Sequence, residues 1–157
     1  MEKIRTHASR ALDEMGIPYQ VLRHDHKAKN VEEAAAERGV PVQQIVKTLL
    51  VRRPDRRHLI ALVRGDQRLS LKKLARLTKV KTLEMAPEAD VSRITGYQIG
   101  AVAPVGLRRS DLSIFVDHHI LEQPRVSISA GRHDAGLELA TEDLIRAVGG
   151  QVADITE

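Results

Sequence analysis

The sequence predicts a mixed α/β (α+β) fold in which helices surround a largely antiparallel, mixed sheet. Residues 45–51, IVKTLLV, are apolar on both alternating faces, which is typical of a central strand covered on both sides. The turn-forming pair Pro54-Asp55 separates this run from a second β-rich run, residues 58–63, as in an antiparallel hairpin. Helical patterns lie between further strand candidates, so we expect both kinds of element along the whole chain.

Helix signals occur in five places. The predicted helices are one that ends near residue 15 before Gly16, residues 31–38 after the cap Asn30, one from the cap Ser70 through residue 77, a short one that starts at Pro87, and residues 141–148 with Thr141 as cap. The remaining strand candidates are residues 19–23, 80–85, 97–102, 112–116, 125–129 and 137–140. We find no internal repeat or linker, so residues 1–157 are expected to form a single domain.

Composition excludes several kinds of chemistry. The chain has no cysteine, which removes disulfides, thiolate metal sites and cysteine nucleophiles. A charged, amphipathic beginning and the lack of a long apolar stretch predict a cytoplasmic protein with no membrane partner. The net charge of +4 permits an acidic partner such as nucleic acid. With one Phe, two Tyr and no Trp, RNA binding would depend on phosphates and shape rather than base stacking.

Lys47 is unexpected in its setting, because lysine is rarely buried and Ile45 and Leu49 should share its face of the strand. Its ammonium either reaches solvent along the side-chain stem or meets an anion, such as a phosphate or a developing negative charge. The strand alone favours neither reading.

Residues 95–106, TGYQIGAVAPVG, combine three glycines and a proline with a strand candidate. Glycines allow close backbone approach, and free backbone N–H groups could bind an oxyanion. The alternative is a bulge or a pair of turns, and glycine spacing by itself favours this structural reading.

Other groupings of reactive residues are weaker. Ser129, His133 and Asp134 are the residue types of a hydrolase triad, but adjacent His and Asp rarely orient each other and no GxSxG elbow surrounds the serine. The remaining patterns are Asp117-His118-His119, interpreted as a chance phosphoesterase match, His24-Asp25-His26, interpreted as polar surface, and Arg64-Gly65-Asp66, interpreted as a turn. We therefore predict no metal site.

Several motifs occur in one order: VEEAAAERGVPVQQIVKTLLV, LSLKKLARLTKVKTLEM, TGYQIGAVAPVGL, VSISAG and LELATEDL. Over roughly residues 16–155 this order resembles the YbaK/ProX family of aminoacyl-tRNA deacylases, relatives of the editing domain of bacterial prolyl-tRNA synthetase. The resemblance implies that editing-domain fold and a trans-editing hydrolase that uses no cofactor. Its implied substrate is mischarged aminoacyl-tRNA, typically tRNA for proline carrying Cys, Ala or another small residue. Prolyl-tRNA synthetase is an implied partner, and the oligomeric state stays open. The alternative is a non-catalytic tRNA-binding or synthetase-associated module with the same fold.

The resemblance also assigns site residues. Lys47, Gly100 and Ser129 match the family's catalytic positions, and no side-chain nucleophile is implied. An aminoacyl ester is already activated, so a positioned cation, backbone donors and an oriented water can suffice. The substrate-binding residues implied by the motifs are His24, Thr48, Gly96, Tyr97, Pro104, Gly106 and Gly131.

Three positions depart from the best-known cysteine-specific members. Those proteins carry a Tyr near the position of His24 and an Asp near Gly136, and a Gly-Gly pair where this chain has Gly100-Ala101. Because a pocket discriminates by size and by unpaired polar groups, these changes leave the preferred amino acid open.

Overall fold

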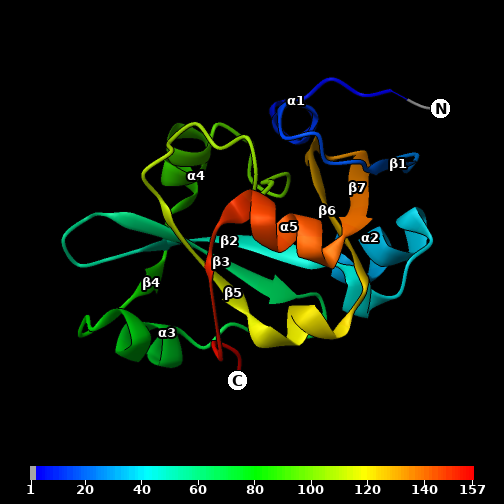
Figure 1. Ribbon diagram of the computed structural model, residues 1–157. Coiled ribbons are helices and arrows are strands. Elements are labelled where there is room, and N and C mark those ends of the chain that lie inside the picture. Colours follow the sequence, from blue (N-terminus) through cyan, green and yellow to red (C-terminus); the bar gives the residue numbers. More distant parts are fainter. Residues whose placement is uncertain (1–2) are drawn as a thin grey trace.

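The computed structural model describes residues 3–157, and Figure 1 shows their arrangement. The helices are α1 (His7–Glu14), α2 (Val31–Arg38), α3 (Leu71–Thr78), α4 (Glu88–Thr95) and α5 (Thr141–Val148), with 3₁₀ turns η1 (Val42–Gln44) and η2 (His118–Glu122). The strands are β1 (Gln20–Arg23), β2 (Val46–Arg52), β3 (His58–Arg64), β4 (Glu84–Met85), β5 (Ser113–Asp117), β6 (Arg125–Arg132), β7 (Ala135–Ala140) and β8 (Gln151–Ala153). All five predicted helices are present, and the mixed fold class is confirmed.

The strands form two sheets rather than the one that was predicted. An antiparallel sheet has the order β1-β7-β6, and a mixed sheet has the order β4-β2-β3-β5-β8, with parallel pairing of β5 to both β3 and β8. A single parallel bridge between Ile45 and Ser127 connects the two sheets. This junction places the start of β2 beside β6.

Capping residues explain where most helices begin. The side chains of Asn30 and Ser70 accept hydrogen bonds from the backbone of Glu33 and Lys73, as their sequence positions predict. Thr141 was wrongly predicted as a cap. It is the first helical residue of α5, and its hydroxyl donates to the carbonyl of Gln123, so it joins α5 to η2 instead of closing its own helix.

Two strand predictions were wrong. Residues 97–102 form turns, because Gly96 and Gly100 adopt φ angles of 82° and 83°, which no regular strand contains. Only Glu84–Met85 of the predicted strand 80–85 pairs with β2. The sequence reading missed β8, a short strand that packs at the sheet edge.

Each face of the five-stranded sheet has its own apolar cluster. Val46 and Leu50 of β2 belong to the larger cluster, which also contains residues of α1, α4, α5 and the three-stranded sheet. Val51 belongs to the smaller cluster, with Leu74 of α3 and the alternate residues of β3. Figure 1 accordingly shows α3 on one side of this sheet and α4 and α5 on the other. None of the helices in residues 3–157 has the length and apolarity needed to cross a membrane.

Candidate active site

One edge of β2 is largely open. The strand pairs with β3 along its whole length, but on the other edge it pairs with β4 only at Val51 and Arg52. The Leu50 carbonyl accepts a hydrogen bond from Ala86 N at 3.0 Å on this edge, whereas the Ile45 carbonyl accepts from Gly65 N on the β3 side. Because backbone groups alternate between the two edges, the N–H and C=O of Thr48 face the open edge. Unpaired backbone donors and acceptors are therefore available there.

A cavity of about 350 Å³ lies against this edge, and we call it the edge cavity. Its walls are mostly aliphatic and come from β2, α4 and the loop before and after Gly100. The polar residues that line it are Arg38, Lys47, Thr48 and Ser129. An apolar hollow with a few convergent polar groups is typical of a site that binds a small organic group. The structure thus brings together four residues predicted for the site: Lys47, Thr48, Gly100 and Ser129.

Lys47 is half-buried, and its ammonium donates a 2.6 Å hydrogen bond to the carbonyl of Gln67. Its side chain lies on the face of Leu49, as the alternation of the strand predicts. Burial lowers the pKa of Lys47, with Arg68 acting in the same direction and Glu32 and Asp66 opposing it. The lysine is therefore neither fully solvated nor paired with an anion in the described structure. Its ammonium keeps two further donors for a ligand.

Ser129 fixes the loop that carries Gly100. Its hydroxyl donates to the Ala101 carbonyl at 3.0 Å and accepts from the backbone N–H of Gly131 at 3.0 Å. The ring of His133 bonds the Ile99 carbonyl at 2.9 Å. Within residues 3–157, the Ser129 hydroxyl therefore bonds backbone groups and no histidine ring.

Tyr97 holds the next part of the glycine segment. Its side chain is buried, and its hydroxyl donates to the Val105 carbonyl at 2.6 Å. A Cβ atom at Gly106 would lie 2.8 Å from this hydroxyl, and one at Gly131 would lie 2.7 Å from the ring. Tyr97 and Gly131 line a different surface hollow beside α1, together with Gly96. Pro104 is buried, and neither it nor Gly106 lines a hollow described in residues 3–157. Pro104 and Gly106 therefore pack within the glycine segment and help to fix its shape.

His24 lies outside the edge cavity. It lines an adjoining hollow of about 290 Å³, which we call the basic cleft and whose basic side chains are His24, Lys27, Lys29, Arg38, Arg132 and His133. The two hollows share Arg38 and Gly100. The predicted site residues that line a hollow are therefore divided among the edge cavity, the basic cleft and the hollow beside α1.

Arg38 is the residue that the sequence reading missed. It extends from the end of α2, and its Nη1 donates to the hydroxyl of Ser127 at 3.1 Å. A Cβ atom at Gly136 would lie 2.6 Å from its Nε, so the guanidinium occupies the space that a side chain at position 136 would need. Burial lowers the pKa of Arg38 to about 10, and the side chain remains charged at neutral pH. The available sequence signal was the position of Arg38 three residues after buried Ala35, on the same helix face.

Buried polar atoms without partners gather at these two hollows. Among the described residues, the buried side-chain atoms with no hydrogen bond are His24 Nε2, Arg38 Nε and Thr48 Oγ1. All of them belong to side chains that line the edge cavity or the basic cleft. Since buried polar groups are normally satisfied, unmet groups in one place indicate a site whose ligand is the missing partner.

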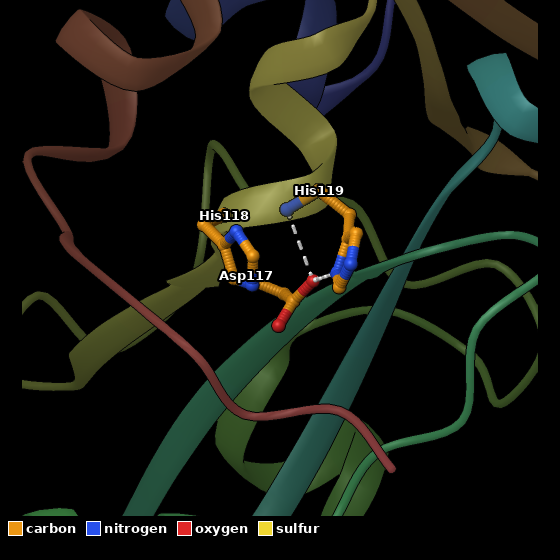
Figure 2. Close-up of side chains that lie close together, drawn as sticks. All are labelled: Asp117, His118 and His119. Carbon is orange, nitrogen blue, oxygen red and sulfur yellow. Dashed lines mark hydrogen bonds and ion pairs between the residues drawn. The ribbon is translucent and has the colours of Figure 1, made fainter.

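The Asp117-His118-His119 cluster is structural. Figure 2 shows the carboxylate of Asp117 bonded to the backbone and ring of His119, at 3.1 and 2.7 Å. Its other oxygen accepts from Ile155 N and from the Thr156 hydroxyl. Both oxygens of this buried carboxylate are therefore fully used, one by His119 and the other by the C-terminal segment. A second group that could hold a metal, His26 with Glu33 and Glu37, lies on the surface of α2 and its ring already bonds both carboxylates.

The fold and the edge cavity define a class of protein that receives a small group beside an open strand edge. The family model of the aminoacyl-tRNA editing domain matches residues 25–147, so the chain belongs to this family. The resemblance drawn from the motifs and the prediction of an aminoacyl-tRNA editing hydrolase are thereby confirmed.

Individual relatives agree with this assignment. The chain is 29% identical over 156 residues to a candidate Cys-tRNA(Pro)/Cys-tRNA(Cys) deacylase of Enterococcus faecalis, with 97% of this chain and 93% of that protein covered. It is 48% identical over 79 residues to the proline–tRNA ligase of Geobacter sulfurreducens, where the match covers 50% of this chain and 14% of the ligase. The solved structure of a candidate trans-editing enzyme for prolyl tRNA synthetase superposes with a TM-score of 0.88 at 31% identity and 99% coverage of both chains.

Proposed function

We propose that this protein hydrolyses the ester that joins a wrong, small amino acid to tRNA, and that its main substrate is tRNA for proline carrying Cys, Ala or a similar residue. The observation that carries the proposal is the edge cavity, about 350 Å³ of mostly aliphatic space that Lys47, Thr48 and Ser129 help to line. Aliphatic walls suit a small side chain, and the polar groups suit the ester. The name of the Enterococcus relative supports the choice of substrate.

In this mechanism Lys47 binds the terminal adenosine phosphate or the ester region. Of residues 100–106, Gly100 and Val102 line the edge cavity, and their backbone N–H groups polarise the ester carbonyl, while Ser129 orients the amino acid or the attacking water. The Ser129 hydroxyl retains one acceptor lone pair for this role, because Gly131 N–H uses the other. Water adds to the carbonyl carbon, the bond to the ribose oxygen breaks, and that oxygen leaves with a proton. Positioning and charge stabilisation can supply the rate because the ester is already activated.

A panel of mischarged tRNAs tests the proposal. Purified protein is given Cys-, Ala- and Ser-tRNA for proline, and release of free amino acid is followed in single-turnover reactions. We expect release from at least one member and a loss of at least 100-fold in Lys47→Ala, which removes the cation. Lys72→Ala, an exposed lysine on α3, is the matched control and should behave as wild type. Release from no member, or full activity of Lys47→Ala, contradicts the mechanism. Binding of tRNA without release would favour the non-catalytic module.

We also propose that residues 1–157 act as one editing domain in the cytoplasm and meet prolyl-tRNA synthetase while it charges tRNA. The support is the 48% identity to a 79-residue part of a proline–tRNA ligase. Co-sedimentation of this protein with the synthetase, with and without tRNA, measures the association. Separate sedimentation under both conditions would contradict it.

A further inference from the structure

The basic cleft lies beside the edge cavity, where the rest of an extended ligand would lie if one of its ends occupied that cavity. The two hollows share the lining residues Arg38 and Gly100, so the cleft adjoins the edge cavity. The cleft is formed by the segment after β1, the start of α2 and the turn between β6 and β7. Figure 1 shows α2 beside the three-stranded sheet that carries this turn.

The charges of the cleft are only partly neutralised. Arg132 is paired with Asp134 at 2.9 Å. Lys27 and Lys29 are exposed, and neither forms an ion pair within residues 3–157. Two of the three acidic residues of α2, Glu33 and Glu37, pair with the ring of His26 instead. The cleft therefore presents free positive charge to a ligand.

Arg38 is more buried than the two lysines and has a buried nitrogen without a partner. In the described part of the chain it bonds only the neutral oxygens of Ser127 and Ile128, its Nε is buried without a partner, and it has no carboxylate. A largely buried cation without an anion is costly, and an anionic ligand at the junction of the two hollows would remove that cost. His24 adds a buried ring nitrogen, Nε2, that also lacks a partner.

We propose that the basic cleft binds the phosphodiester backbone of the single-stranded 3′ end of tRNA, and that Arg38 contacts the phosphate at the junction with the edge cavity. This inference rests on the proposed function, because the esterified end of the same strand would occupy the edge cavity. Spaced cations match a chain of phosphates, and a guanidinium suits a phosphate by its planar fork. The scarcity of aromatic side chains fits recognition through phosphates.

Binding of two RNA hairpins tests the cleft. One ends in a four-nucleotide single-stranded 3′ tail and the other is blunt, and both are uncharged and fluorescently labelled. We expect wild type to bind the tailed hairpin at least tenfold more tightly. Lys27→Ala/Lys29→Ala should weaken that binding about tenfold and reduce the dependence of log Kd on log [KCl] by roughly 1.4, about 0.7 for each lost contact to a single strand.

The matched control is Lys72→Ala/Lys81→Ala, which removes two exposed lysines from a hollow beside α3. It should retain the affinity and the salt dependence of wild type. Equal binding of the two hairpins by wild type overturns the proposal, as does a cleft variant that binds the tailed hairpin like wild type.

Two variants test Arg38. Arg38→Met should weaken binding of the tailed hairpin about tenfold and lower the salt dependence by roughly 0.7, with circular dichroism confirming the fold. Arg38→Lys keeps the positive charge, and it tests the same contact if the Arg38→Met variant does not fold. It should retain the salt dependence but bind several-fold more weakly, because an ammonium lacks the fork. If the folded Arg38→Met variant or the Arg38→Lys variant binds the tailed hairpin as tightly as wild type, the proposed contact between Arg38 and a phosphate is wrong.

Hydrolysis of an aminoacyl ester of adenosine separates this proposal from the function on which it rests. This ester has no phosphate, so its cleavage by wild type tests ester hydrolysis alone and should not depend on salt. If wild type cleaves it but the cleft variants bind the tail normally, the function stands and the cleft proposal fails. If wild type binds the tail as proposed but cleaves neither this ester nor aminoacyl-tRNA, the proposed function fails.

Discussion

Lys47 and Thr48 are neighbours in the chain but serve opposite faces of β2. The Lys47 side chain lies on the Leu49 face and reaches the carbonyl of Gln67, whereas Thr48 shares the face of Val46 and Leu50. The Thr48 hydroxyl is buried without a hydrogen bond. A polar group in this state lowers the stability of the free protein and is ready to bind a polar group of a substrate.

Thr48→Val should therefore separate stability from activity. The substitution keeps the shape of the side chain and removes the unpaired hydroxyl, so we expect an increase of about 1 kcal/mol in the free energy of unfolding, a Tm rise of roughly 2–4 °C. Deacylation should fall about tenfold. Thr95→Val is the control, because the Thr95 hydroxyl donates to the Val91 carbonyl at 2.7 Å and its loss should destabilise the fold. A Thr48→Val protein that is less stable than wild type contradicts this reading. Thermal melts and single-turnover assays provide both measurements.

At the scale of elements, the loop that contains Gly100 is positioned by close packing rather than by a strand. Tyr97 bonds Val105 across the loop, and its ring lies against Gly131 of β6. Ser129, also on β6, bonds Ala101. The loop is thus attached to β6 at two points, and Gly100 is held between them.

Gly131→Ala should break this attachment. Its Cβ atom would lie 2.7 Å from the Tyr97 ring at a φ angle of 90°, so both overpacking and backbone strain apply. We expect a loss of roughly 2–4 kcal/mol in urea unfolding. Gly149→Ala, with φ of 60° and no atom within 4 Å of the added Cβ, isolates the backbone strain and should cost about 1 kcal/mol. Equal losses in the two variants would show that the Tyr97 contact is unimportant.

At the scale of the whole molecule, Asp117 fastens the C-terminal segment to the five-stranded sheet. Its carboxylate accepts from Ile155 N at 3.0 Å, and the Ile155 carbonyl in turn accepts from Ser70, the cap of α3. Leu69 and Thr156 form a further bridge. One buried carboxylate thereby helps to join β5, the C-terminal segment and α3.

Asp117→Asn should lower the free energy of unfolding at neutral pH, and this effect should shrink in acid. Burial acts to raise the pKa of Asp117, but hydrogen bonds from Ile155 and His119 outweigh it and hold the pKa below its ordinary value of 3.8. A lowered folded pKa stabilises the protein above the unfolded pKa, and this contribution is lost as pH falls through the folded pKa. We expect the variant to lose roughly 2–3 kcal/mol at pH 7 and progressively less below pH 4.

Urea unfolding of wild type and Asp117→Asn at several pH values measures this difference. Asp111→Asn is the control, because Asp111 forms an exposed pair with Arg109 that solvent screens. A difference between wild type and Asp117→Asn that stays constant down to pH 2 would exclude a role for the charge.

The sequence alone determined the family, the hairpin of β2 and β3, and the helix caps at Asn30 and Ser70, and it named four residues that line the edge cavity: Lys47, Thr48, Gly100 and Ser129. These features depend on local backbone preferences and on short patterns, which neighbouring residues specify. Only the tertiary structure decided that the strands form two sheets, that residues 97–102 turn, and that Arg38 fills the space above Gly136. Such features depend on which distant segments meet: the Nη1 of Arg38 reaches Ser127 across a sequence separation of 89 residues. The open edge of β2 is also tertiary, because it exists only where β4 stops pairing and the loop around Gly100 faces the strand.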